Sequence, residues 1–557
     1  MDSSSPTSRA EALAPWIVGA LFALPVLIAK YPPMDDLPLH EASIGLLRHW
    51  GDVRFAPPTL YAINLGHSNQ LFSFLVLFLS YAVPIGWASK LVIAAALVAL
   101  PVAAAHFADH VGASRWTALL VAPVGLGWLF FWGLVQNILG LVALLWLLPS
   151  IDRFASGPTW RGAIKLCGAM VVLHFAHQAM QLVACAALVL CSIGMPWRAK
   201  PMALRTIPAF FCVALAFAAN RYSWRFAGAR HLRQPPFQWY SLPHKLVGVP
   251  GVLFGGYEPY IRNLVMLLAL VPVVFLAVGR SPANSGPAPT LGERVHRWRF
   301  ELLVLLLVVI YFAGPANVRS TTLVYHRFLP PAWAIFAVCA GIHSRAMNRV
   351  VVRALCAVVP AATLLIAWPS FADSHRVYSD LEKIIDRIDI GSSVLALNIG
   401  AQVPHRLWNP IVAMGHVIAV RGGRSLFDYT HSPVSPVTQR AEKQWENTLD
   451  RIEARSVHFC PDWDFTLFRY VLIATPESGL ASALAMAFKD DAHLAAQSGA
   501  WYLFESNLPL VPIDADEPEL PSPHPPSLQT LLLQLADDLK RTEREVGPEP
   551  PHTILEH

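Results

Sequence analysis

Long apolar runs constrain this chain more than any other feature of its sequence. A helix of about 20 apolar residues crosses the roughly 30 Å hydrocarbon core of a bilayer. Only 14% of the 557 residues are charged, whereas soluble domains carry about 25%. The sequence therefore predicts a polytopic α-helical membrane protein with about eleven spans. The predicted spans are 14–30, 69–87, 90–108, 116–131, 133–150, 165–194, 206–220, 260–278, 300–316, 328–343 and 354–371.

Some of these spans leave alternatives open. Residues 116–150 could form two short spans or a re-entrant hairpin, and 165–194 could be one tilted helix or two half-helices. Segment 206–220 is short for a span. His174 and His177 lie midway along 165–194, where hydrogen bonds between helices are the favoured role over metal binding.

The charges around the spans give an orientation. Arg9 precedes the first apolar run and no small-x-small cleavage site follows it, so we expect a retained helix with a cytoplasmic N-terminus. Loops 31–68, 221–259 and 317–327 then lie outside. Cations divide almost evenly between the two sides, so the positive-inside rule favours this topology only weakly.

Two adjacent carboxylates, Asp35 and Asp36, follow the first predicted span. Acids at a bilayer edge can take a proton or hold a cation beside a lipid-linked substrate. Asp36 precedes Leu37-Pro38 and suits a helix N-cap, so Asp35 is the favoured chemical group. Apolar residues at helical spacing in 39–50 predict an interfacial helix directly after the pair.

The later outer loops combine cations with aromatic residues. Residues 221–262 contain six cations and one acid, a composition suited to a phosphate with a sugar or prenyl group. Anchoring at the membrane interface is the alternative role. Candidate phosphate-binding residues are Arg221, Arg225, Arg230, Arg233, Lys245, Arg319, Tyr325, His326 and Arg327; candidate substrate contacts are His40, Tyr257 and Glu258.

Metal-binding patterns are weak in this sequence. His106, Asp109 and His110 have the spacing of ligands on one helix face, but a polar helix end explains them better. Of the seven cysteines only Cys460 lies outside the apolar segments, and no Cys-x-x-Cys pair exists. We assign no metal site; a divalent cation at the Asp35/Asp36 pair is the single candidate cofactor.

Composition changes after residue 371. We expect a small α/β domain over 372–508 and a Pro-rich, largely disordered tail over 509–557. No Gly-rich phosphate loop follows a strand, which excludes a nucleotide site of that type, and the net charge of +5 does not indicate nucleic acid. The expected elements are helices at 379–388 and 480–488 and strands at 393–398, 416–420, 470–474 and 499–504.

This layout resembles the GT-C superfamily of polytopic membrane glycosyltransferases that use polyprenyl-phosphate sugars. The resemblance covers residues 1–508 and is strongest at 31–50, where the acidic pair precedes the expected interfacial helix. It implies that residues 1–371 form the membrane domain and that 372–508 is extracytoplasmic. It also implies that Asp35 or Asp36 is the general base and that the cationic loops hold the donor phosphate.

The implied activity is transfer of a sugar from a polyprenyl-phosphate donor to an acceptor on the outer membrane face, in the bacterial inner membrane. The partners are then the lipid bilayer and the lipid-linked sugar, with no nucleic acid. Two other classes stay open at this point. One is a transporter or flippase of lipid-linked saccharides, and the other is a non-catalytic membrane assembly factor.

Overall fold

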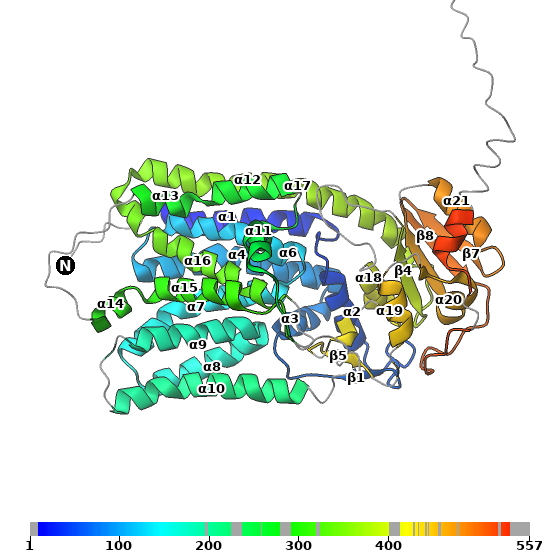
Figure 1. Ribbon diagram of the computed structural model, residues 1–557, viewed down its shortest axis with the longest axis horizontal. Helices are drawn as coiled ribbons and strands as arrows, with labels where there is room; N and C mark the ends of the chain where they lie inside the picture. Colours follow the sequence, from blue (N-terminus) through cyan, green and yellow to red (C-terminus); the bar gives the residue numbers. More distant parts are fainter. Residues whose placement is uncertain are drawn as a thin grey trace, which may run out of the picture.

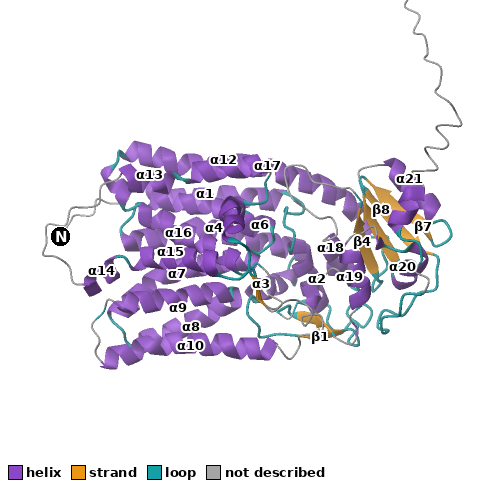
Figure 2. Ribbon diagram, viewed as in Figure 1, coloured by secondary structure: helices purple, strands orange, loops and turns teal. Residues whose placement is uncertain are grey.

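A long bundle of helices forms most of the molecule, and a small sheet lies at one end of it (Figure 1). This computed structural model describes the chain except residues 1–8, 194, 196–198, 224–236, 258, 279–290, 319–322, 400–412, 427–428, 433, 441–442, 444, 455–457, 476–477, 522–524 and 535–557. In the described part, helices predominate and strands are confined to the sheet and two short pairs (Figure 2).

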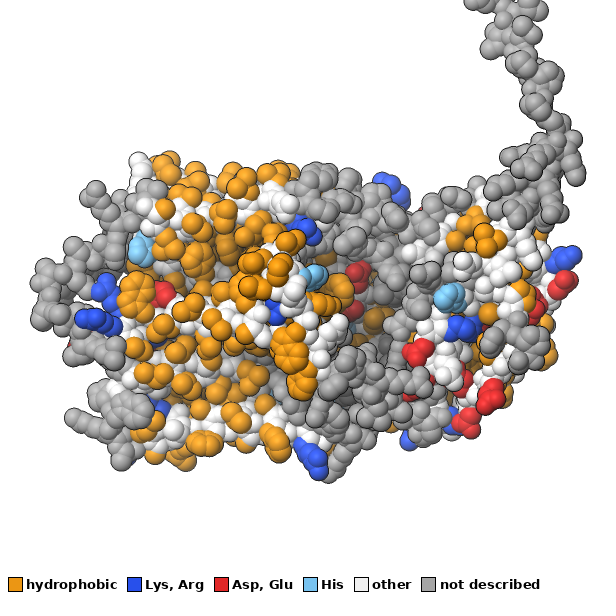
Figure 3. All heavy atoms as spheres, in the orientation of Figure 1, with side chains coloured by type: hydrophobic (Ala, Val, Ile, Leu, Met, Phe, Trp, Pro, Cys, Tyr) orange, Lys and Arg blue, Asp and Glu red, His pale blue; other side chains and the backbone are white. Residues whose placement is uncertain are grey.

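The bundle is built from apolar helices. Among the described residues, five are long and apolar enough to cross a membrane: α1 (Arg9–Ile28), α4 (Ile85–Val111), α7 (Val135–Ser156), Lys200–Ala219 of α10 (Ala199–Ser223) and α17 (Arg349–Ile385). Apolar side chains cover the visible face of the bundle, while many of the charged ones lie toward its two ends and over the sheet region (Figure 3). This distribution is that of a protein embedded in a bilayer.

Several predicted spans are interrupted or short. Shorter helices of the bundle are α3 (Leu71–Ser80), η1 (Arg115–Val121), α5 (Ala122–Gly125), α6 (Trp128–Phe131), α8 (Trp160–Ala176), α9 (Gln178–Ile193), α11 (Leu242–Phe254), α12 (Pro259–Ala269), α13 (Val271–Val278), α14 (Leu291–Arg297), α15 (Arg299–Ala313) and α16 (Leu329–Ala340). Segment 165–194 is two helices, 116–131 is three short pieces, and α10 is longer than the expected 206–220. The number of spans stays a prediction.

The break between α8 and α9 has a local cause. His177 has extended backbone angles, φ −165° and ψ 120°. Asn69, at a positive φ of 66°, donates its backbone N–H to the carbonyl of His174, and its side-chain oxygen accepts the N–H of Gln178. The break is stabilised because these bonds satisfy backbone groups that a continuous helix would have paired internally.

The sheet at the end of the bundle has the strand order β4-β6-β8-β7. β4 (Val394–Asn398) is parallel to β6 (Tyr470–Ala474), whereas β8 (Trp501–Ser506) is antiparallel to both β6 and β7 (Ala492–Ser498). Alternate residues of β6 enter two separate apolar clusters, so both faces of the sheet are covered. Three helices of this C-terminal region are α19 (Glu446–Ala454), α20 (Pro461–Leu467) and α21 (Ser478–Ala487).

One expectation for the C-terminal half is wrong. Residues 416–420 belong to a helix, α18 (Met414–Arg421), because this short apolar run packs against another helix, and periodicity alone does not separate such runs from strands. The helix expected at 379–388 is confirmed up to residue 385, where it is the end of α17, a helix of 37 residues. In the Pro-rich tail, a short helix begins at Leu528, where an amphipathic segment is expected; Leu528 is buried and its N–H donates to the carbonyl of Phe459.

The segment after α1 joins the bundle to the sheet region. It forms α2 (Leu37–Arg48), the predicted interfacial helix, which packs closely against α18. A short antiparallel pair, β1 (Tyr61–Ile63) with β5 (Val437–Gln439), adds a second connection. A further pair, β2 (Phe237–Gln238) with β3 (Asn317–Val318), joins two of the loops predicted to lie outside. The α2–α18 contact therefore sets how the C-terminal half sits over the bundle.

Gly45 of α2 makes this close contact possible. A Cβ at Gly45 would lie 2.7 Å from the carbonyl oxygen and 2.8 Å from the Cα of Ala419. We expect Gly45→Ala to destabilise the protein by about 1–3 kcal/mol, because backbone atoms have to move. Thermal unfolding in detergent measures this effect.

Gly86→Ala is the matched control. Gly86 is also helical, at the start of α4, and a Cβ there meets nothing within 4 Å. This variant should be neutral or stabilised by up to about 1 kcal/mol. Equal melting temperatures for the two variants would contradict the importance of the α2–α18 contact.

Candidate functional site

The acidic pair lies where the bundle meets the sheet region. The chain after α1 is attached to α17: the Lys30 N–H donates to His375 Nδ1 at 3.0 Å, and Ser374 Oγ donates to the carbonyl of Tyr31 at 2.9 Å. Lys30 also forms an ion pair with Glu382. These bonds fix the segment that leads into Asp35 and Asp36.

Backbone hydrogen bonds then hold the pair against the junction of α6 and α7. The N–H groups of Asp35 and Asp36 donate to the carbonyls of Phe131 and Trp132, each at 3.0 Å. Gly133 is required there: its φ is 85°, and a Cβ would lie 2.5 Å from the Asp36 nitrogen. The two carboxylates are therefore placed by backbone contacts from both sides.

Asp36 does not act as the helix cap that the sequence predicts. It occupies the N-cap position of α2, but its side chain makes no capping hydrogen bond. The reason for preferring Asp35 as the chemical group is therefore removed. Asp36 lies deep among protein atoms yet stays partly accessible to water. Asp36 is thus surrounded by protein while its side chain still reaches water.

The environment of Asp36 raises the pKa of its carboxyl to about 7. Desolvation by burial is the largest cause and the negative charge of Asp35 is the second, while the positive charge of Arg327 opposes them. A carboxyl with this pKa changes between its acid and base forms near neutral pH. Groups tuned in this way are typical of general acids and bases.

Arg327 is the cation that faces this carboxyl. It comes from η3 (Tyr325–Phe328), and it too is deep but partly water-accessible. Burial lowers the pKa of Arg327, whereas Tyr429 and Asp36 raise it. Since each group shifts the pKa of the other, Asp36 and Arg327 occupy one electrostatic site.

His177 positions the guanidinium. Arg327 Nη1 donates to His177 Nε2 at 3.1 Å. A guanidinium only donates, so His177 must be neutral, with its proton on Nδ1. His177 is buried at the α8–α9 break, and Gly140 leaves room for it, since a Cβ at Gly140 would lie 2.6 Å from His177 Cβ.

Tyr429 and His40 form another wall of the site. Tyr429 belongs to η6 (Tyr429–His431), and its ring lies 4.3 Å from the ring of His40, edge to face. Burial raises the pKa of Tyr429 and lowers that of His40 to about 4, so both stay neutral near pH 7. Gln136 approaches His40 Nε2 at 3.1 Å. The predicted substrate residue His40 therefore lies at the site, on the first turn of α2.

A buried hydrogen-bonded pair lies one residue beyond His40. His416 Nδ1 of α18 is 2.9 Å from Glu41 Oε2, and both side chains are 4% exposed. The Tyr31 ring lies 4.3 Å from the His416 ring, and burial and the Glu41 charge raise the pKa of Tyr31. The pair links α2 to α18 and so supports the placement of His40 and Tyr429.

Three other predicted phosphate-binding residues lie close to one another. Lys245 Nζ donates to the carbonyls of Phe312 and Gly314, and it lies 4.5 Å from the centre of the Tyr325 ring. Tyr325 is buried and its ring is 3.9 Å from that of His326. Lys245 and Tyr325 thus fix the end of α15 in this structure. Their role toward a phosphate stays a prediction.

The remaining predicted residues are not brought to Asp36 by any described contact. Tyr257 is buried, and its hydroxyl donates to the carbonyl of Leu126, which is a contact between loops of the bundle. Arg221 is exposed at the end of α10. Arg225, Arg230, Arg233, Arg319 and Glu258 lie outside the described residues.

The side chains with metal-ligand spacing have separate partners. Asp109 receives two hydrogen bonds from Arg115, His110 Nε2 lies 2.7 Å from Asp152, and the His106 ring stacks on Trp146. No group of three or more His, Cys, Asp or Glu within the described residues could hold a metal ion. At the acidic pair, Arg327 is the described positive partner, and a cation there stays a prediction.

Comparison with solved structures defines the class of fold. Two crystal structures of ArnT from Cupriavidus metallidurans match, one bound to undecaprenyl phosphate and one in the apo state. The first has a TM-score of 0.51 and 9% identity, and the match covers 89% of this chain and 98% of the ArnT chain. The second has a TM-score of 0.50 and 10% identity, and the match covers 88% of this chain and 98% of the ArnT chain.

This protein therefore has the overall fold of the two ArnT structures, and together with its apolar helices this fold makes it an integral membrane protein. ArnT is the particular protein that it resembles. No family model and no curated protein sequence matches the chain. At 9–10% identity the likeness establishes the fold, and the reaction is argued separately below.

Sequence reasoning missed four residues of the site region: His177, Tyr429, Gln136 and His416. His177 was singled out as polar within an apolar segment, which was the available signal. Tyr429 follows a stretch that reads as a turn, and nothing local to it indicates chemistry. Each joins the site through contacts that are distant in sequence.

We expect His177→Ala to lower activity more than His177→Gln does, because the Gln carbonyl can still accept the bond from Arg327. The difference should be on the order of 3- to 10-fold in kcat/KM, the size of one hydrogen bond to a charged group. Kinetics of both purified variants measure it. Equal losses would show that His177 acts only in packing.

Proposed function

We propose that this protein is a membrane glycosyltransferase that moves a sugar from a polyprenyl-phosphate donor to an acceptor on the outer face of the membrane. One observation carries the proposal. A carboxyl with a pKa near neutrality and a guanidinium lie in one deep, water-accessible site where the bundle meets the C-terminal half. The ArnT structure that contains undecaprenyl phosphate has the same fold and supports a donor of that class.

Asp36 is the proposed general base. Its carboxylate form accepts the proton of an acceptor hydroxyl while the hydroxyl oxygen attacks the sugar carbon that bears the phosphate. The raised pKa makes it a stronger base than an ordinary aspartate, and its base form is available near neutral pH. Asp35 then acts on Asp36 through its charge.

Arg327 is the proposed donor-phosphate contact. As the sugar–oxygen bond breaks, negative charge grows on the leaving phosphate, and a fixed guanidinium stabilises it. Lying deep in the protein strengthens this interaction because water screens it less. His177 holds the guanidinium in place before the donor arrives, so little reorganisation is needed.

The proposed sites and domains follow from this assignment. Residues 1–371 form the membrane domain, and 372–508 cover the site from the outer side. The neutral His40 and Tyr429 line the place where an uncharged sugar or acceptor lies. The N-terminus is then cytoplasmic, in a bacterial inner membrane. Lys245, Tyr325 and His326 extend the phosphate side of the site, while Tyr257 has a structural role.

A transporter of lipid-linked saccharides is less well supported. Such a protein needs polar groups free to face a path near the bilayer midplane. Several polar groups at the α8–α9 break are bonded within the protein: His174 Nδ1 meets Gln181 Oε1 at 2.9 Å, and Gln181 donates to the carbonyl of Cys212. The break between α8 and α9 therefore accounts for these polar residues, so a transport path is not needed to explain them.

We expect Asp36→Asn to lower kcat by about 10²- to 10⁴-fold, because Asn cannot accept the proton. Asp35→Asn is the matched control: it should retain most activity and shift the pH optimum slightly downward, since removing its charge lowers the pKa of Asp36. Transfer from a synthetic polyprenyl-phosphate sugar in detergent measures both. If only Asp35→Asn lost activity, Asp35 rather than Asp36 would be the general base.

The pH dependence follows from the same groups. Activity should rise with pH through a midpoint of about 7, because the base form of Asp36 increases through its pKa. Arg327 lowers this pKa. The residual activity of Arg327→Gln should therefore have its midpoint at higher pH, whereas Arg327→Lys, which keeps a positive charge, should shift it less. An unchanged midpoint in Arg327→Gln would show that the charge of Arg327 does not act on Asp36.

A further inference from the structure

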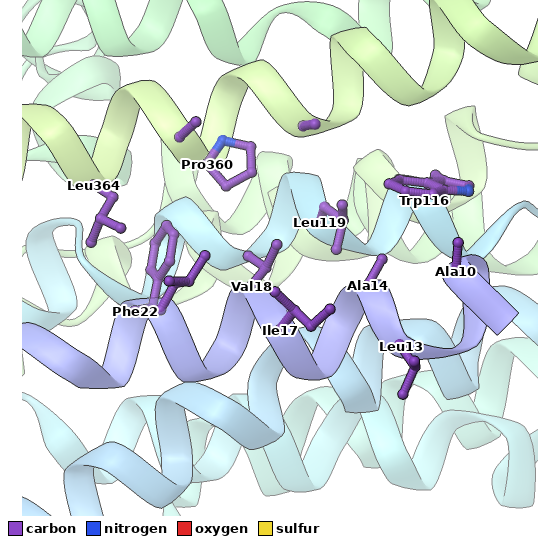
Figure 4. A pocket seen from close by; sticks show the side chains of 13 residues that line it. Ala10, Leu13, Ala14, Ile17, Val18, Phe22, Trp116, Leu119, Pro360 and Leu364 are labelled. Carbon is purple, nitrogen blue, oxygen red and sulfur yellow. The ribbon is translucent and has the colours of Figure 1, made fainter.

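An apolar groove runs along the surface of the bundle, toward the end opposite the acidic pair. It lies between α1, η1 and α17 and has a volume of about 400 Å³ (Figure 4). Leu13, Ile17 and Leu21 line it, and their side chains are 54%, 56% and 46% exposed. Its volume is in the range of small-molecule sites, about 300–1,000 Å³.

Small side chains create this groove. Ala10 and Ala14 lie one turn apart on α1, and Ala357 and Ala361 lie one turn apart on α17, so each pair presents one face of its helix. Trp116 and Leu119 of η1 also line it. The helices therefore leave a channel that larger residues would fill.

The length of the groove matches one leaflet of a bilayer. The lining residues of α1 extend from Ala10 to Phe22, which corresponds to about 18 Å along a helix. One leaflet contributes roughly 15 Å of hydrocarbon, half of a core of about 30 Å. A single extended hydrocarbon chain of a membrane lipid fits this length.

The end of the groove near the start of α1 presents a hydrogen-bond donor and a cation. Trp116 Nε1 is buried with no hydrogen-bond partner among the described residues, although an indole N–H normally has one. The guanidinium of Arg353 lies 5.6 Å from the centre of the Trp116 ring. Arg9 begins α1 and Arg349 begins α17, so further cations belong to the same end.

The acids at this end already have partners within the protein. Glu11 accepts bonds from Ser114 Oγ and from the N–H of Arg115, while Asp109 receives two bonds from the Arg115 guanidinium. The donor and cation around Trp116 are thus suited to an anionic group arriving from outside.

We propose that this groove binds an anionic glycerophospholipid from the leaflet on the side of the α1 N-terminus. One acyl chain lies along Ala14, Ile17 and Ala361, and the phosphate accepts the Trp116 N–H beside Arg353. Lipid tails are as apolar as the groove, so the hydrophobic effect gives no preference inside the bilayer. The headgroup contacts therefore provide the specificity. This site is independent of the proposed glycosyl transfer.

Native mass spectrometry of the detergent-purified full chain tests the proposal, with phosphatidylglycerol and phosphatidylcholine as probes. The wild type should retain one phosphatidylglycerol. Ala361→Phe fills the groove at an exposed position, and Arg353→Gln removes the charge; each should lower retention by roughly tenfold or more. Val358→Phe is the control, because Val358 is 50% exposed on the same helix and does not line the groove.

Trp116→Phe tests the hydrogen bond, since it removes the indole N–H and keeps a smaller aromatic ring. It should weaken phosphatidylglycerol retention more than any small drop in melting temperature explains. Equal retention of the two lipids, unchanged retention in Ala361→Phe and Arg353→Gln, or displacement by a polyprenyl phosphate at equal concentration would each overturn the proposal. If Ala361→Phe fails to fold, Arg353→Gln and Trp116→Phe decide the outcome.

Discussion

The paired backbone hydrogen bonds from Asp35 and Asp36 to Phe131 and Trp132 are the contact on which the organisation of this end of the protein depends. In a membrane protein, irregular backbone is stable only where its polar groups are satisfied within the structure. The chain between α1 and α2 is irregular, and so is the junction of α6 and α7. Each provides the partners that the other lacks, and Gly133 allows them to approach. The acidic pair is thereby held at a fixed depth.

The same principle explains why the site is assembled from broken helices. The α8–α9 break places His177 where its imidazole can accept from Arg327, and Asn69 satisfies the backbone that the break exposes. Arg327 itself lies in a 3-10 turn that precedes α16. A continuous helix presents side chains along its flank, whereas these interruptions direct polar groups into one place. The charge of Asp36 and the charge of Arg327 then moderate each other at a deep position in the protein.

The C-terminal half contacts α2 beside the acidic pair. Tyr429 reaches His40, and the His416–Glu41 pair lies directly behind, at the interface of α18 and α2. A buried pair of this kind costs desolvation and by itself adds little stability, but it strongly disfavours any other arrangement of the two helices. It therefore fits a role in fixing the register of α2, and with it the position of His40 and Asp36. The proposed lipid groove lies far from this interface, at the other end of α1.

The sequence by itself determined the membrane class of this protein and the place of Asp35-Asp36 directly after the first apolar segment, while a chemical role for these two acids stays a prediction. Apolar length and charge are local properties, so they can be read directly. Strands such as β4 and β6 were also predictable, because their buried apolar runs are short and bounded by polar residues. Only the tertiary structure decided that Asp36 is the tuned acid, that Arg327 faces it, and that residues 416–420 are helical. These outcomes depend on burial and on contacts between residues hundreds of positions apart, and no local pattern encodes either of them.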